Sequence, residues 1–279
     1  MIYCPYTDKE LPEHDTSMEH ILPLALGGIN GFEILVSEKL NSKLSSKIDG
    51  KLANDFLVMN RRNKLNIKGH SKKRPVFKAK KAQDGDSGYP LQVSLDGFDS
   101  NINVWDPISS RILEKSEHPS VLQLRTHLDI DIDLQFVAKT ALSAGYFMYG
   151  EVFRSNVKHE ELRYMMSNPL SKMGPEQYSI ETTADGRFST DKNRKLEILR
   201  ACCTGLKYSS IVGIIPSPKS LSIFVGVLGY YIGMVNVPAN TKNFPNQGPY
   251  NWGHVVYVQN NKLIRCSFAK LLDSVSSAR

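Results

Sequence analysis

The fold is decided by the run Glu19-His20-Ile21-Leu22-Pro23-Leu24-Ala25-Leu26-Gly27-Gly28. In this run a carboxylate stands beside a histidine, and a proline and a glycine pair follow. Adjacent residues of a strand point to opposite faces, so Glu19 and His20 need a strand end or a bend to serve one site. Because packing alone hardly explains such a run, it indicates a functional site.

Two strands and a helix are expected around this run. The strands cover residues 17–36 and are joined at Gly27-Gly28, and the helix covers about 38–49 and ends near Gly50. Ser37 is a candidate N-cap. The apolar face of the helix consists of Leu40, Leu44, Leu52 and Phe56. The sequence thus predicts a ββα unit with Asn41 at the start of the helical pattern.

Further pieces follow the opening run in a fixed order. They are Asn41, Ile48-Asp49, and then Arg62, Leu65, Ile67, Gly69, Ser71, Lys73 and Pro75. With these pieces the chain from about Ile2 to Pro75 resembles the HNH endonucleases, also called ββα-metal nucleases. The resemblance covers about a quarter of the chain and rests on the ordered series, since a Glu-His pair alone is uninformative.

The resemblance implies roles for three side chains. His20 would be the general base that takes a proton from the water attacking a phosphodiester, a task that suits imidazole near neutral pH. Glu19 and Asn41 would hold one divalent cation, Mg²⁺ or Mn²⁺, which would neutralise charge on the leaving 3′ oxygen. The alternatives are a structural histidine at position 20 and a polar helix cap at position 41.

The sequence departs from the family pattern in two places. Many relatives bind zinc through two C-x-x-C pairs. In this sequence Thr7 stands where the second cysteine of the first pair would be, and Leu40 stands where a cysteine would precede Asn41, so no structural zinc is expected. The middle asparagine of the family fixes the loop that bears the histidine. We assign it to Asn30, a predicted catalytic residue, although the usual interval falls near Glu33 or Ile34.

Positive charge is concentrated in the first third of the chain. The whole chain has 35 Lys plus Arg and 28 Asp plus Glu, and residues 1–82 carry +6 of the net +7. The segment from Arg61 to Lys81 has ten basic residues and no acidic one, which would attract a phosphate backbone. A solvated surface is the alternative. The predicted DNA contacts are Lys43, Arg61, Arg62, Lys64, Lys68, Lys72, Lys73 and Arg74.

The predicted fold class is α+β, with three segments. An HNH domain is expected over 1–66, a basic β-rich connector over 67–130, and a mixed helix and sheet domain of open role over 131–279. Helical spacing predicts a helix from Asp131 to about Met148 and a second over His159 to Met166. Strands are expected near 178–183, 211–215, 221–227, 230–237, 253–259 and 262–268, with a hairpin turn at Asn260-Asn261.

The sequence therefore predicts a metal-dependent DNA endonuclease of bacterial or phage origin, acting in defence against foreign DNA. Two alternatives stay open: a catalytically silent nucleic-acid-binding protein, and a nuclease gated by a ligand or partner at 131–279, where a homodimer contact is also considered. RNA is a weaker alternative substrate.

The expected setting is a reducing cytoplasm, because the four cysteines form no disulfide framework and no secretory leader is expected at the N-terminus. No membrane partner is expected, since the longest apolar stretch, Ile223 to Val237, is short and interrupted by glycines.

Overall fold

The computed structural model describes residues 1–69, 72–73, 75–95, 102–169, 172, 179–184, 193–206 and 208–277. By its contacts the chain forms two compact units. Unit 1 contains Met1–Leu52 together with Asp129–Arg279, and unit 2 contains Ala53–Leu128. The expected division at 66 and 130 follows composition, whereas the contacts join the N-terminal segment to the C-terminal one.

Unit 1 begins with two antiparallel strand pairs and a helix. The first pair is β1 (Ile2–Cys4) with β2 (Lys9–Leu11), and the second is β3 (Thr16–His20) with β4 (Glu33–Ser37). A 3₁₀ turn, η1 (Glu13–Asp15), separates the pairs. Helix α1 (Glu38–Leu44) follows β4 and continues through a π turn, η3 (Ser45–Asp49), into α2 (Gly50–Ala53). The expected order of two strands and a helix is present, with shorter strands and an interrupted helix.

The connection between β3 and β4 is a docked loop with its own 3₁₀ turn, η2 (Leu24–Leu26), and this differs from the tight turn expected at the glycine pair. Ser210 donates its hydroxyl hydrogen to the Leu26 carbonyl at 2.5 Å. Gly27 has a φ of +81°, and a Cβ there would lie 2.6 Å from Leu228; a Cβ on Gly28 would lie 1.6 Å from the Leu22 carbonyl oxygen. Both glycines are therefore required by the close approach of this loop to its surroundings.

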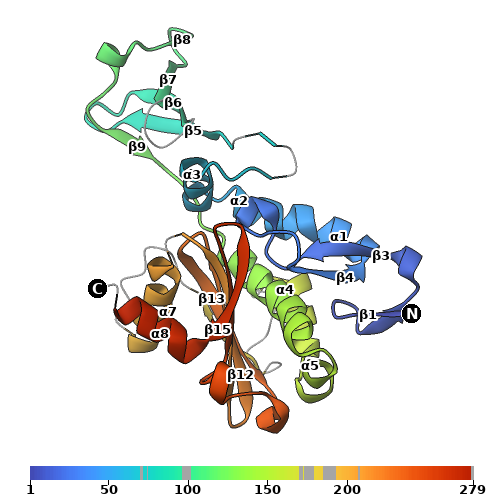
Figure 1. The fold of residues 1–279 in the computed structure, drawn as a ribbon. Helices are drawn as coiled ribbons and strands as arrows, with labels where there is room; N and C mark the ends of the chain where they lie inside the picture. Colours follow the sequence, from blue (N-terminus) through green and yellow to red (C-terminus); the bar gives the residue numbers. More distant parts are fainter. Residues whose placement is uncertain are drawn as a thin grey trace. The chain divides into compact units, whose positions relative to one another are not determined.

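The central helix of unit 1 is α4 (Ile130–Tyr149), the green helix in Figure 1. Asp129 caps it by accepting the N–H of Ile132. Every residue from Ile132 to Gly145 is buried. The helix contacts the sheet of unit 1 as well as β4, η3 and α6 (Glu160–Ser167), and α5 (Glu151–Asn156) follows it. The helices expected in this part of the sequence are confirmed.

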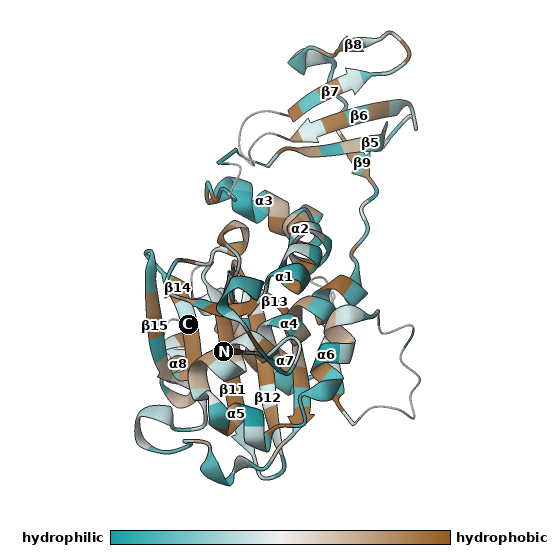
Figure 2. Cartoon of the chain, turned by 90° about the vertical axis from the view of Figure 1, so that its right-hand side faces the viewer, coloured by the Kyte–Doolittle hydropathy of each residue, from teal (hydrophilic) through white to brown (hydrophobic). Residues whose placement is uncertain are grey.

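The sheet of unit 1 has six antiparallel strands in the order β10-β13-β12-β11-β14-β15. A Cβ on Gly233 would meet Val137 of α4, whereas the adjacent Met234 packs in the cluster of α7 and α8. Helix α4 therefore covers one face of the sheet, and α7 and α8 cover the other (Figure 1). The central strands β11 and β12 are mostly apolar along their length (Figure 2) because both faces of the sheet are covered. The elements are β10 (Glu181–Ala184), α7 (Arg194–Gly205), β11 (Ser210–Ser217), β12 (Ser220–Val227), β13 (Tyr230–Pro238), η6 (Thr241–Asn243), η7 (Gly248–Tyr250), β14 (His254–Gln259), β15 (Lys262–Ser267) and α8 (Phe268–Ser276).

Most of the strands expected in this part of the chain are confirmed. Asn260 and Asn261 both have positive φ, 52° and 57°, as a two-residue hairpin turn requires. The strand expected near 178–183 begins later, at Glu181, and residue 178 lies outside the described residues. The sequence analysis did not identify α7 or α8.

Unit 2 combines one helix with a five-stranded antiparallel sheet of order β8-β7-β6-β5-β9. Asp55 caps α3 (Phe56–Lys64) by accepting the N–H groups of Leu57 and Val58. The sheet has its own core, formed by Ala79, Ala82, Leu91, Val93 and Val104. The remaining elements are β5 (Phe77–Asp84), β6 (Pro90–Leu95), β7 (Ile102–Asp106), β8 (Arg111–Ile112), η4 (Lys115–Glu117) and β9 (Leu122–Leu124).

Candidate functional site

His20 ends β3 and meets two side chains that come from the start of β4 and the loop before it. Its Nε2 lies 3.0 Å from Asn30 Oδ1 and 2.9 Å from Glu33 Oε1. Glu33 is opposite His20 in the strand register, and its second oxygen accepts the N–H of Gly31 at 3.3 Å. The side chains of His20 and Glu33 are 17% and 18% exposed. The structure thus brings Asn30 to His20 and adds Glu33, and we call these three residues the His20 group.

These contacts favour one tautomer of His20. A carboxylate and an amide oxygen both accept hydrogen bonds, so in the neutral ring Nε2 carries the proton that it shares with Glu33 and Asn30. Glu33 holds the ring in this tautomer and orientation, as a carboxylate does in other histidine-based sites.

Glu19 projects from the other face of β3, into the interior of unit 1. There the Nζ of Lys139 forms an ion pair with Glu19 and a second with Asp49 Oδ2, the latter at 2.6 Å. Lys139 is 1% exposed, Glu19 6% and Asp49 8%. We call these three residues the Lys139 cluster; the sequence analysis had not identified Lys139.

The Lys139 cluster keeps its ammonium charged. Burial alone would lower the pKa of Lys139, but Asp49, Tyr6 and Glu19 together outweigh burial and hold this pKa above its ordinary value. Burial raises the pKa of Asp49 to about 6, although the ammonium of Lys139 opposes that shift. One cation therefore serves two buried carboxylates.

Glu19 and Asn41 are expected to hold a divalent cation, but their contacts in this structure do not suit a cation site. The charge of Glu19 is already neutralised by a buried ammonium, which a metal ion would have to displace. Asn41 is 9% exposed, and its Nδ2 donates to Ser17 Oγ at 3.1 Å and to the Met18 carbonyl at 3.3 Å. In this arrangement Asn41 ties α1 to β3.

The predicted nucleic-acid contacts fall into three groups. Lys64, Lys68, Lys72 and Lys73 are exposed in unit 2, and Arg61 is half-buried there. Lys43 is exposed on α1 in unit 1, and Arg74 lies outside the described residues.

Arg62 corrects the expectation of a DNA contact. It is 6% exposed, and its Nη1 donates to the Ala53 carbonyl at 2.7 Å. Because the guanidinium lies inside unit 2, where burial lowers its pKa, Arg62 serves the fold of unit 2.

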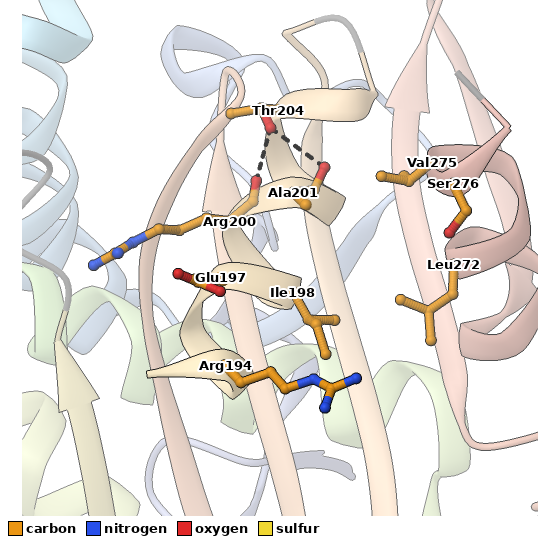
Figure 3. A pocket seen from close by; sticks show the side chains of 9 residues that line it. All are labelled: Arg194, Glu197, Ile198, Arg200, Ala201, Thr204, Leu272, Val275 and Ser276. Carbon is orange, nitrogen blue, oxygen red and sulfur yellow. Dashed lines mark hydrogen bonds between the residues drawn. The ribbon is translucent and has the colours of Figure 1, made fainter. Parts of the chain in front are cut away.

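A groove of about 800 Å³ lies between α7 and α8 (Figure 3). Its walls include Arg194, Glu197 and Arg200 from α7 and Leu272 and Val275 from α8. The Thr204 hydroxyl at one end donates back to the carbonyls of Arg200 and Ala201 within its own helix. None of the predicted site residues lines this groove.

The described residues contain neither a cluster of metal-ligand side chains nor a membrane-spanning helix. Within them, no three or more His, Cys, Asp or Glu residues gather into a group that could hold a metal ion. No helix in the described part of the chain is both long and apolar enough to cross a membrane.

Comparisons with known proteins supply no relative. No family model matches the chain. No curated protein and no solved structure matches it either.

Proposed function

We propose that the protein hydrolyses phosphodiester bonds of DNA, with His20 as the general base. The observation that carries the proposal is the His20 group, in which a partly exposed imidazole at the end of β3 is held through Nε2 by Asn30 and by the carboxylate of Glu33. The resemblance of residues 2–75 to HNH endonucleases supports the choice of a phosphodiester as substrate.

In the proposed reaction, a water molecule attacks the phosphorus while His20 takes its proton. The bond from phosphorus to the 3′ oxygen breaks, and the leaving oxygen is protonated from solvent. Asn30 and Glu33 act as positioning residues because both contact Nε2 of the His20 ring. No step is assigned to a cation at Glu19, since Lys139 already neutralises that carboxylate.

The test is relaxation of supercoiled plasmid by the full chain with Mg²⁺, Mn²⁺ or EDTA. His20→Ala should lower the rate by at least about 100-fold, the usual contribution of a general base. His14→Ala is the matched control, since the His14 side chain is 82% exposed and should leave the rate unchanged. Undiminished cleavage by the His20→Ala protein would overturn the proposal.

The EDTA arm tests the dependence on a cation separately. Cleavage that needs Mg²⁺ or Mn²⁺ and is lost in Glu19→Gln would mean that a cation displaces Lys139 from Glu19. Cation-dependent cleavage that persists in Glu19→Gln would place the metal elsewhere.

A catalytically silent nucleic-acid-binding protein is the second candidate. The observation that favours it is the Lys139 cluster, which occupies the carboxylate that the family pattern assigns to a metal. Binding of DNA without cleavage under every cation condition would support this candidate. For either function we propose a reducing cytoplasm, supported by the four free cysteines.

A further inference from the structure

Strand β5 of unit 2 contains a bulge that turns two lysines outward together. Ala79 is opposite Val93 of β6, but Ala82 is opposite Leu91, so β5 has one extra residue between these pairs. Ala79 and Ala82 are both buried in the core of the sheet, while Lys80 and Lys81 are both exposed. In a regular strand one of two adjacent lysines would point into the core. The bulge therefore places both charges on the solvent side.

The two lysines line a pocket of about 340 Å³ with Arg125, which follows β9. The rest of the described lining is neutral and includes Gln83, Pro90 and Gln123, and no carboxylate among the described residues lines the pocket. Among the described residues, none of the three cations forms an ion pair. Three cations around a hollow without a counter-charge favour an anion, and a guanidinium matches the oxygens of a phosphate.

Trp105 of β7 lies on the outer face of the same sheet. It is opposite Gln92 of β6 and Ile112 of β8 in the register, and it is 38% exposed. Pro107, two residues further on, lines the pocket. Strands β5 and β7 flank β6, so the lysines and the indole are about 10 Å apart across the sheet. An aromatic ring and a phosphate pocket thus lie on neighbouring parts of one surface.

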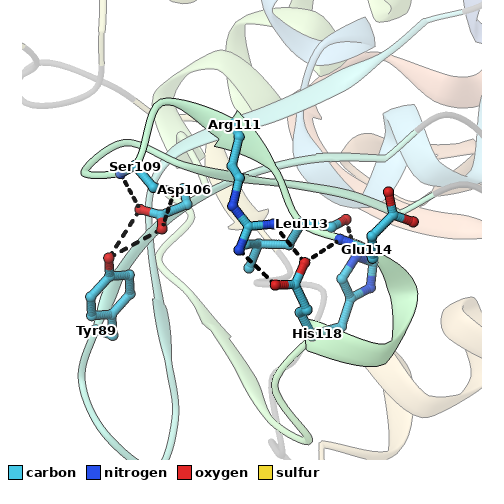
Figure 4. A network of polar contacts seen from close by, with 8 residues as sticks. Tyr89, Asp106, Ser109, Arg111, Leu113, Glu114 and His118 are labelled. Carbon is cyan, nitrogen blue, oxygen red and sulfur yellow. Dashed lines mark hydrogen bonds and ion pairs between the residues drawn. The ribbon is translucent and has the colours of Figure 1, made fainter.

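A polar network holds the turn that bears Pro107 (Figure 4). Asp106 accepts hydrogen bonds from the Tyr89 hydroxyl, from the Ile108 and Ser109 N–H groups and from the Ser109 hydroxyl. Arg111 pairs with Glu117 through both of its terminal nitrogens, at 2.7 and 2.6 Å. Arg111 is thus neutralised by Glu117, whereas Lys80, Lys81 and Arg125 of the pocket have no ion pair among the described residues.

We propose that this outer face of unit 2 binds a single strand of nucleic acid, with a phosphate in the pocket of Lys80, Lys81 and Arg125 and a base stacked on Trp105. An indole on an open sheet can stack only on a base whose face is free, and a duplex hides its base faces. This inference rests on the proposed function, because it takes the nucleic acid of that function as the ligand and adds that the bound form is a single strand.

The test measures the affinity of the full-length His20→Ala protein for labelled oligonucleotides of ~15 nucleotides by fluorescence anisotropy. The probes are oligo-dT, oligo-rU and a duplex of the same length, so a preference between the first two identifies the sugar. Trp105→Ala should weaken binding of the single strand by about tenfold, whereas Trp105→Phe, which keeps a stacking ring, should bind nearly as the parent does.

The pocket is tested with Lys80→Ala/Lys81→Ala, which should also weaken binding about tenfold. This variant should lower the salt slope by roughly 0.7 for each phosphate that the lysines no longer neutralise. Lys158→Ala/Lys219→Ala is the matched control, because it removes two exposed lysines from unit 1. Equal affinity for duplex and single strand together with no effect of Trp105→Ala would overturn the proposal, as would normal binding by the Lys80/Lys81 variant.

Because every protein in this test lacks His20, its result does not depend on cleavage. Predicted binding, with no cleavage of either plasmid or single-stranded DNA by the parent chain, would refute the proposed function and leave this site standing. Cleavage that requires His20, combined with unaffected binding by all the variants, would refute this site alone.

Discussion

At the scale of single residues, the proposed role of His20 as a base depends most on its contact with Glu33. Glu33→Gln keeps an oxygen that can accept the Nε2 hydrogen but removes the charge that stabilises a protonated ring. We expect the maximal cleavage rate to fall about tenfold with an unchanged KM, because the proposed function places Glu33 against the His20 ring and not against the substrate. Steady-state cleavage of a labelled DNA substrate measures both constants.

Glu38→Gln is the matched control for Glu33→Gln, since Glu38 is exposed at the start of α1. A rise in KM with an unchanged maximal rate in Glu33→Gln would contradict the positioning role. It would place Glu33 at the substrate instead.

Which residues of the candidate site could be predicted depends on how local their contacts are. Asn30 lies ten residues from His20, and Glu33 is near the expected interval for the middle asparagine, so both were within reach of a local pattern. Lys139 was not, because it lies in an apolar helix and its partner Asp49 is 90 residues away. A lone lysine in such a helix does not indicate which buried carboxylates it meets.

At the scale of secondary-structure elements, the Lys139 cluster joins α4, β3 and the π turn η3 inside unit 1. Lys139→Met would leave two carboxylates buried without a cation, which should lower the free energy of unfolding by about 3–5 kcal/mol. Urea unfolding followed by circular dichroism measures the change. The triple variant Lys139→Met/Glu19→Gln/Asp49→Asn should recover most of the loss, because no buried charge remains.

Lys158→Met is the control for Lys139→Met, since Lys158 is exposed and its replacement should change stability by less than about 0.5 kcal/mol. An equally small loss in Lys139→Met would show that Glu19 and Asp49 do not need the ammonium. The cluster would then be no obstacle to a cation at Glu19.

The elements that the sequence could predict are those with strong periodicity. Helical spacing of apolar residues predicted α4. A different local signal, the asparagine pair at 260 and 261, predicted the turn of the last hairpin. No sequence pattern predicted the bulge in β5, because apolar and polar residues do not alternate over residues 79–82. Only the register with β6 shows that Lys80 and Lys81 share a face. The glycine pair at 27 and 28 predicted only a turn. The docking of Gly27 against Ser210 and Leu228 was not predictable, because these residues lie far along the chain.

At the scale of the whole molecule, the two units differ in charge. Residues 53–128 contain 13 Lys plus Arg and 8 Asp plus Glu, so unit 2 carries +5 of the net charge of +7 in about a quarter of the chain. The His20 group belongs to unit 1. The proposed chemistry and most of the attraction for a polyanion are therefore assigned to different units.

The units should also differ in their response to acid, because His159 and His254 are buried in unit 1, whereas no histidine in the described part of unit 2 is buried. His254 is 3% exposed, packs against the rings of Tyr149 and Tyr250, and its Nδ1 has no hydrogen-bond partner among the described residues. Burial, with a smaller effect of Arg265, lowers the pKa of His254 to about 4.

Between about pH 6.5 and pH 4 the unfolded chain binds a proton that folded His254 does not, so this residue makes unit 1 less stable as the pH falls. The raised pKa of Asp49 acts in the opposite sense, which is why His254 must be isolated by comparing the parent with a variant. Relative to the parent, His254→Phe should gain about 3 kcal/mol in the free energy of unfolding between about pH 7 and pH 4.

The chain has two tryptophans, one in each unit, so each unit can be followed separately. Urea unfolding with Trp105→Phe leaves Trp252 to report on unit 1, and Trp252→Phe leaves Trp105 to report on unit 2. The gain from His254→Phe should appear only in the Trp252 signal. The same gain in both signals would mean that the units unfold together, and no gain in either would mean that His254 is protonated in the folded chain at about pH 4.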